Sequence, residues 1–227
     1  MPGDMKYNLT NNPILKDYQI QIMELFFGSD FGQPFFLTGG TALSAFYFAH
    51  RESKDLDFFT LQPFDPTRLT QIISEIADET ASVSNAKVAS NTYQEIYLTN
   101  DKLGWTQRID IVHDVPRHFG ELAKVGNIIV DSLENIGSNK VLAVFGRIEP
   151  KDYIDLYVIL KNSSLKFDQL FELAKQKDLG LDKFHFVHSI NQIARIEAWP
   201  ENKLGIKNSQ IIDFFQTLVQ QLLREIK

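Results

Sequence analysis

The chain has 227 residues, enough for one large domain or two small ones, and none of them is cysteine. The absence of cysteine excludes disulfides, thiolate zinc sites and thiol nucleophiles, so any metal would bind oxygen or imidazole ligands, and hard cations such as Mg²⁺ are favoured. The net charge of −6 disfavours nonspecific nucleic-acid binding without excluding a local basic groove, and the lack of a signal peptide or a long apolar run predicts a cytoplasmic protein with no membrane partner.

The first part of the chain alternates helical and extended patterns. Apolar residues recur at helical spacing, and the short apolar runs that follow are bounded by glycine, proline or polar turns. Thr41 is well placed to cap the second helix. The predicted elements are, in chain order, a helix at 14–27, a strand at 35–38, a helix at 41–50, a strand at 56–61 and a helix at 65–79.

The middle of the chain is rich in β-forming residues, and its last third carries helical periodicity. We expect two or three more strands within residues 83–115, and helices from about residue 131 to the end. These patterns predict an α+β fold, in which an N-terminal α/β domain with a mixed sheet flanked by helices precedes a C-terminal helical bundle. The expected domains are residues 1–125 and 126–227.

A glycine pair follows the first predicted strand. Gly39 and Gly40 would leave backbone N–H groups unobstructed at the start of a helix, an arrangement that suits a phosphate group, and Thr41 could add a hydroxyl donor. The alternative is that the glycines only let the strand turn sharply into a packed helix. The stretch matches neither the dinucleotide-binding fingerprint nor the Walker A motif, so both readings stay open.

Two carboxylates stand at the start of the second predicted strand. Side chains alternate along a strand, so Asp55 and Asp57 would share one face while Leu56 and Phe58 point to the core. Two carboxylates on one face attract a divalent cation, although nearby basic side chains and solvent could also offset their repulsion. The apolar run follows the pair rather than preceding it, which favours a metal-binding strand over an aspartyl phosphatase.

A third carboxylate, Asp110, lies within an otherwise apolar predicted strand, where an unpaired charge is costly. If this strand lies beside the strand of Asp57, three carboxylates converge as they do in sites that hold two magnesium ions for displacement at phosphorus. The alternative is an Asp110 carboxylate that is simply paired with Arg108 or a neighbouring lysine.

Further along, Lys140, Arg147 and Lys151 form a local basic cluster in an acidic protein. Asp152 and Asp155 are three residues apart and therefore lie on adjacent faces of the predicted helix. From the residues alone, we interpret these five side chains as an exposed ion-pair network.

Two blocks of sequence resemble a known family. The stretch LTGGTALSAFYFAHRESKDLDFF, from Leu37 to Phe59, is similar to the signature of the nucleotidyltransferase superfamily of DNA polymerase β, and more narrowly to that of the AbiEii/AbiGii-type toxin nucleotidyltransferases. The second block, NKVLAVFGRIEPKDYIDLYVIL from Asn139 to Leu160, resembles a downstream motif of the same family. With Asp110, the resemblance covers most functional positions between Gly39 and Asp155.

The resemblance implies a nucleotidyltransferase domain at residues 1–125 and a helical domain at 126–227. It implies that a metal ion, Mg²⁺ or Mn²⁺, is bound by Asp55, Asp57 and Asp110, and that these residues and Lys140 are catalytic. The residues that it places at the nucleotide are Gly39, Gly40, Thr41, Arg51, Ser53, Arg147, Asp152 and Asp155.

The activity implied by the resemblance is transfer of a nucleoside monophosphate from a nucleoside triphosphate to an acceptor hydroxyl. In toxin relatives the acceptor can be the 3′ end of tRNA, and a toxin would have a cognate antitoxin partner. Two alternatives stay open: a nucleotidyltransferase that modifies a protein or a small molecule, and a nucleotide-binding module without turnover.

Overall fold

The computed structural model describes residues 5–226, which form two compact units. The first unit comprises the chain up to Tyr47 together with Ser53–Ser132, and the second comprises Phe48–Glu52 together with the chain from Leu133 onward. Residues 1–4 and 227, at the outer ends of the expected domains 1–125 and 126–227, lie outside the described part. The boundary expected after residue 125 falls within a hairpin of the first unit.

A seven-stranded sheet forms the centre of the first unit, in the order β3-β4-β5-β2-β1-β7-β6. Two parallel pairs (β2 with β5, β1 with β7) occur together with four antiparallel ones, so the predicted α+β fold with a mixed sheet is confirmed. The elements of this part are α1 (Asp17–Gly28), β1 (Phe35–Thr38), α2 (Gly39–Ala42), the π-helix η1 (Leu43–Phe48), β2 (Leu56–Thr60), α3 (Pro66–Glu79), β3 (Val83–Ala89), β4 (Tyr93–Asn100), β5 (Trp105–His113), β6 (Ala123–Val125) and β7 (Ile128–Val130).

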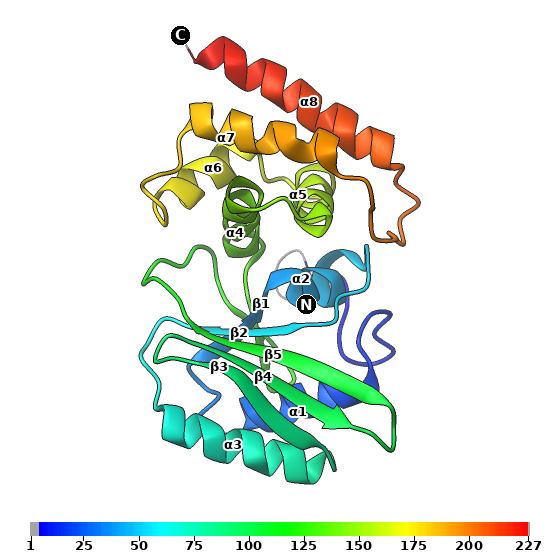
Figure 1. Ribbon diagram of the computed structural model, residues 1–227, viewed down its shortest axis with the longest axis vertical. Helices are drawn as coiled ribbons and strands as arrows, with labels where there is room; N and C mark the ends of the chain where they lie inside the picture. Colours follow the sequence, from blue (N-terminus) through cyan, green and yellow to red (C-terminus); the bar gives the residue numbers. More distant parts are fainter. Residues whose placement is uncertain (1–4, 227) are drawn as a thin grey trace. The chain divides into compact units, whose positions relative to one another are not determined.

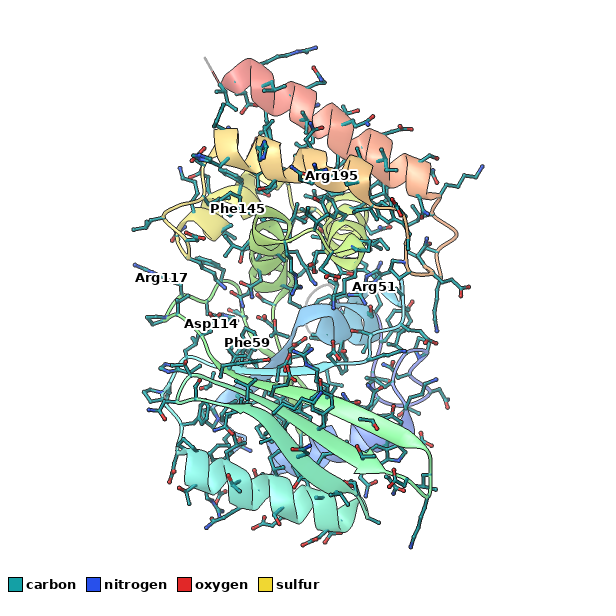
Figure 2. The ribbon with its side chains drawn as sticks, in the orientation of Figure 1. Arg51, Phe59, Asp114, Arg117, Phe145 and Arg195 are labelled. Carbon is teal, nitrogen blue, oxygen red and sulfur yellow. The ribbon has the colours of Figure 1, made fainter. Side chains whose placement is uncertain are left out.

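One face of the sheet is covered by α1 and α3, which contact each other and lie along the same side of the strands (Figure 1). Phe26 of α1 stacks on Phe58 of β2 with ring centroids 4.5 Å apart, and Phe27 meets Phe58 edge-on at 5.0 Å. Phe59 extends from the other face (Figure 2). Because side chains alternate along β2, burial of Phe58 under α1 turns Asp57 to the same face as Phe59.

The helix after the glycine pair begins earlier than the sequence predicts. Thr38 occupies the N-cap position of α2, whose first residue is Gly39, and α2 continues directly into η1. Thr41 therefore lies inside the first turn, where it is fully buried, and the prediction that Thr41 caps this helix is wrong.

The sequence did not predict β6 and β7, which form a hairpin at one edge of the sheet. Each strand has three residues, and β7 is joined to the centre of the sheet through the pairing of Val130 with Leu37. Segments this short carry too few residues to show a period of two, so tertiary pairing decides their conformation.

The second unit is helical, as predicted. Within residues 5–226, no helix combines the length and the apolar character that a membrane-spanning helix needs. The elements of the second unit are α4 (Leu133–Gly146), α5 (Pro150–Asn162), α6 (Phe167–Lys175), α7 (Lys183–Ile190), the 3₁₀-helix η2 (Asn191–Arg195) and α8 (Asn208–Glu225).

Candidate active site

The parallel strands β2 and β5 bring two of the predicted metal ligands side by side. Asp57 is in register with Asp110, and both side chains point to the sheet face that α1 and α3 leave open. Asp55 immediately precedes β2, two residues before Asp57, and is partly exposed. The condition set by the sequence, that the strand of Asp110 lies beside that of Asp57, is therefore met.

The glycine turn lies against the same carboxylate. Thr38, the last residue of β1, pairs with Asp57 across the antiparallel strands, and Gly39 follows with φ of +69°. A Cβ atom built on Gly39 would be 2.2 Å from Oδ2 of Asp57. Only glycine has both the conformational freedom and the missing side chain that this approach requires.

The hydroxyl of Thr41, which was expected to donate to a phosphate group, has another partner. Thr41 donates its hydroxyl hydrogen bond to the backbone carbonyl of Asp55. This bond ties the first turn of α2 to the residue before β2, and so connects the glycine turn to the carboxylate pair. Ser53, the other small polar residue implied by the resemblance, lies partly buried in the loop before β2.

Asp110 is already engaged by a cation of the protein. Nη2 and Nε of Arg108 lie 2.9 and 3.0 Å from the two carboxylate oxygens of Asp110. Both interpretations of Asp110 therefore hold in part, because the residue stands beside Asp57 and is also paired with Arg108. Among the described residues, no group of three or more His, Asp or Glu side chains is arranged to hold a metal ion by itself.

The donor chemistry of this part of the sheet nevertheless suits a hard divalent cation. Asp55, Asp57 and Asp110 offer only carboxylate oxygen, which is the ligand that Mg²⁺ and Mn²⁺ prefer. The missing side chain of Gly39 leaves room for the Asp57 carboxylate itself, since a Cβ atom there would be 2.2 Å from its Oδ2. The residues present therefore fit the metal ion that the sequence predicts.

The other predicted site residues gather in the second unit, in what we call the buried charge cluster. The carboxylate of Asp155 in α5 accepts hydrogen bonds from Nε and Nη2 of Arg51, each at 2.7 Å. Nε2 of His50 lies 2.7 Å from the same carboxylate. Nζ of Lys140 lies 2.7 Å from Asp155 and 2.8 Å from Asp152. The members of the cluster are His50, Arg51, Lys140, Arg147, Asp152 and Asp155.

Burial and charge oppose each other in this cluster. Burial alone would raise the pKa of Asp155, but Arg51 and Lys140 hold that pKa well below its usual range. Burial would likewise lower the pKa of Lys140, yet the two carboxylates raise it. Lys140 and Asp155 are therefore both charged at neutral pH.

The prediction of an exposed ion-pair network is wrong for these residues. The side chains of Asp152 and Asp155 have no exposed surface, that of Lys140 is 8% exposed, and Arg147 is the member that reaches solvent at 53%. The reason is that segment Phe48–Glu52 belongs to the helical unit and covers α5 with Arg51 and His50. The roles implied for Lys140, Arg147, Asp152 and Asp155 at a nucleotide stay predictions.

Residues 22–204 match the family described as nucleotidyl transferase AbiEii toxin of type IV toxin–antitoxin systems. The match spans most of the chain. The chain belongs to the AbiEii family. It is accordingly a nucleotidyltransferase by family, and the family resemblance drawn from the two sequence blocks is confirmed.

Relatives of this AbiEii chain extend the comparison. An uncharacterized protein of Aquifex aeolicus is 27% identical over 214 residues, which cover 92% of this chain and 98% of that protein. The structure of JHP933 from Helicobacter pylori is 17% identical with a TM-score of 0.59 and covers 92% and 90% of the two chains. MenT4, a nucleotidyltransferase toxin from Mycobacterium tuberculosis, is 12% identical with a TM-score of 0.51, over 81% of this chain and 66% of that one. These structures show a shared fold.

Sequence reasoning missed two buried polar groups that support the AbiEii sheet. Gln19 of α1 and Gln107 of β5 both donate to the carbonyl of Lys54, the residue before Asp55, at 3.3 and 2.6 Å. Neutral glutamines 88 positions apart carry no local signal. Their position indicates that they fix the backbone at the start of the carboxylate pair.

The second missed group is an Asp–His pair at the end of β7. Asp131 is fully buried and accepts hydrogen bonds from the hydroxyl of Thr38 at 2.5 Å and the backbone N–H of Ser132 at 2.8 Å. Nε2 of His118 lies 2.8 Å from the same carboxylate. This pair fixes Thr38, the residue before the glycine turn. An aspartate next to the apolar run of β7 was the available signal in the sequence, comparable to Asp110 within its apolar strand.

Proposed function

We propose that this chain is a metal-dependent nucleotidyltransferase toxin that moves a nucleoside monophosphate from a nucleoside triphosphate to a hydroxyl at the 3′ end of tRNA. The observation that carries the proposal is the register of Asp57 with Asp110 beside the glycine turn. Membership of the AbiEii family supports the reaction class and the toxin role.

In the proposed reaction, the acceptor hydroxyl gives its proton to the Asp110 carboxylate and its oxygen forms a bond to the α-phosphorus, the bond from that phosphorus to the β-bridging oxygen breaks, and pyrophosphate leaves with that electron pair. Asp55, Asp57 and Asp110 would hold Mg²⁺ or Mn²⁺, which when bound supplies positive charge for the acceptor and the leaving group. The backbone N–H groups at Gly39 and Gly40 donate hydrogen bonds to the phosphate oxygens, and Asp110 orients the acceptor hydroxyl.

The family description also supports a protein partner. AbiEii toxins are described as parts of type IV toxin–antitoxin systems. We propose that a cognate antitoxin relieves the growth arrest that this chain causes. Expression of the chain with and without the product of the neighbouring reading frame tests this, and arrest that the neighbour does not relieve speaks against that neighbour as the antitoxin.

The experiment for the reaction is incubation of the purified chain with each of the four α-³²P-labelled triphosphates, Mg²⁺ and total tRNA. We expect label in the tRNA with the wild-type chain and none with Asp57→Asn. Asp101→Asn, at an exposed residue of the β4–β5 turn, is the matched control and keeps full transfer. Label found only in a protein fraction would refute tRNA as acceptor, and full transfer by Asp57→Asn would refute the site.

A further inference from the structure

The carboxylate of Asp110 belongs to a compact cluster on β4 and β5, which we call the Arg108 cluster. Besides its two contacts with Asp110, Nη2 of Arg108 lies 3.0 Å from Oε2 of Glu95. The hydroxyl of Tyr93 lies 3.2 Å from Oδ1 of Asp110 and 3.3 Å from Oε2 of Glu95, and can donate its one hydrogen to either carboxylate. The cluster consists of Tyr93, Glu95, Arg108 and Asp110.

Strand geometry builds this cluster. Arg108 and Asp110 are two residues apart on β5 and therefore share a face, and Glu95 is directly opposite Asp110 on β4. The side chains of Asp110 and Glu95 are 13% and 17% exposed, and that of Arg108 is 34% exposed. A guanidinium that contacts both oxygens of one carboxylate forms a strong and directional ion pair. The attraction is stronger when the pair is partly shielded from water.

The electrostatics of Arg108 agree with its geometry. Burial would lower the pKa of the guanidinium, but the hydrogen bond and the charge of Asp110 raise it above its ordinary value. Arg108 therefore stays protonated at every pH at which the protein is folded. It acts as a permanent cation held beside Asp110.

The Arg108 contact competes with metal binding at the Asp110 carboxylate. Both oxygens of Asp110 contact the guanidinium of Arg108, which belongs to the same strand β5, while Asp57 is the neighbour of Asp110 on the adjacent strand β2. A divalent cation shared by Asp57 and Asp110 needs at least one of those oxygens. A metal ion at Asp110 must therefore compete with the Arg108 guanidinium for the charge of the same carboxylate.

We propose that Arg108 is a positioning residue that occupies the Asp110 carboxylate until a divalent cation replaces it, and thereby lowers the metal affinity of the site. When Asp110 binds the metal ion, the guanidinium of Arg108 stays paired with the second carboxylate of the cluster, Glu95. The inference rests on the proposed function in one respect, since it takes Asp110 as a metal ligand.

The test measures binding of Mn²⁺ alone, by electron paramagnetic resonance of the free ion, to the full chain without nucleotide. Arg108→Gln removes the competing cation, and we expect roughly tenfold tighter Mn²⁺ binding, the size that one charged hydrogen-bonded pair accounts for. Lys87→Gln is the matched control. Lys87 of β3 lies over the ring of Tyr97, whose strand partner is Arg108, so this variant removes a positive charge nearby without touching Asp110.

Two further variants separate the specific contact from charge alone. Arg108→Lys keeps the charge but loses the two-pronged contact, so it should bind Mn²⁺ more tightly than the wild-type chain and less tightly than Arg108→Gln. Glu95→Gln leaves Arg108 with Asp110 as its remaining carboxylate in the Arg108 cluster, and should weaken Mn²⁺ binding. If the contact between Arg108 and Asp110 were only structural, Arg108→Gln and Glu95→Gln would not change the Mn²⁺ affinity in opposite directions.

The inference is overturned if Arg108→Gln binds Mn²⁺ no more tightly than Lys87→Gln, or if Arg108→Lys matches the wild-type chain. Circular dichroism of each variant shows whether it is folded, and Arg108→Lys and Glu95→Gln decide the question should Arg108→Gln unfold. Nucleotide transfer is measured separately. A wild-type chain that transfers no nucleotide while Arg108→Gln binds Mn²⁺ more tightly would refute the proposed function and support this inference.

Discussion

The backbone of Gly39 lies so close to Asp57 that a Cβ atom there would be 2.2 Å from Oδ2 of the carboxylate. Gly39→Ala should therefore displace Asp57 and abolish nucleotide transfer. Positive φ at Gly39 adds about 1–2 kcal/mol of backbone strain to the cost. Transfer of labelled nucleotide and thermal unfolding of the variant give the two readouts.

Gly104→Ala is the matched control for this substitution. Gly104 has φ of +70°, but a Cβ atom there would meet nothing within 4 Å. The two variants thus share the backbone strain and differ in the contact with Asp57. Comparable transfer by both would show that the approach of Gly39 to Asp57 does not matter for the reaction.

Lys140→Met should destabilise the chain by about 3–5 kcal/mol, because it removes one partner from a buried pair and leaves carboxylate charge less compensated. Lys140 contacts both Asp152 and Asp155 at less than 3 Å. The measurement is urea-induced unfolding followed by circular dichroism. A cost below about 1 kcal/mol, the range of surface pairs, would contradict the buried charge cluster as described.

Lys175→Met provides the comparison for the loss of a lysine ion pair at the surface. Lys175 lies 3.7 Å from Glu172, and both side chains are about half exposed or more. Such a pair contributes at most about 0.5–1 kcal/mol. We expect the unfolding curve of this variant to overlie that of the wild-type chain.

Stability should fall in two steps as the pH is lowered. Burial lowers the pKa of His50 below its ordinary value of 6.5 despite the contact with Asp155. Below that value the unfolded chain binds a proton at His50 that the folded chain does not, so the free energy of unfolding decreases. The lowered pKa values of Asp152 and Asp155 add a second loss, which begins as the pH falls below their ordinary value of 3.8.

His50→Gln should remove the first of these steps while it retains a donor for Asp155. Urea unfolding at a series of pH values between about 8 and about 5 follows that step. His188→Gln, at an exposed residue of α7, keeps the wild-type dependence. An unchanged pH dependence in His50→Gln would locate the step in another group.

The glutamine pair behind the carboxylates gives a test of coupling. Gln107→Leu removes the hydrogen bonds that Gln107 makes with the carbonyl of Lys54 and with the amide of Gln19, and leaves only the longer bond from Gln19 to Lys54, at a cost of about 1–3 kcal/mol. Because Gln19 and Gln107 are hydrogen-bonded at 3.1 Å, the double variant Gln19→Leu/Gln107→Leu should cost less than the sum of the single changes. Additive unfolding free energies would contradict the coupling.

The elements that the sequence predicts well are those with a long enough repeat. The period of two along β2 and β5 places Asp57 and Asp110 on one face, and the helical period of the last third is visible over many turns. The hairpin of β6 and β7 has no such repeat. Its conformation depends on a partner strand about 90 positions earlier, where Leu37 pairs with Val130.

The charged residues of the candidate site and of the buried charge cluster also show that sequence reasoning is restricted to local pairings. Arg108 is two positions from Asp110, so their pairing is a local alternative that sequence reasoning can weigh. Asp155 is 104 positions from Arg51, and nothing local indicates that this carboxylate is buried. A charged residue on a helix normally indicates a solvated face, and here tertiary packing reverses that rule.

The short segment Phe48–Glu52 has a consequence for how the chain acquires its structure during synthesis. Arg51 leaves the ribosome long before its partner Asp155, which follows 104 residues later. At roughly 5–20 residues per second, the guanidinium waits about 5–20 seconds for its carboxylate. The helical unit therefore completes only late in translation, while the five residues that it needs from the first half stay accessible to competing contacts.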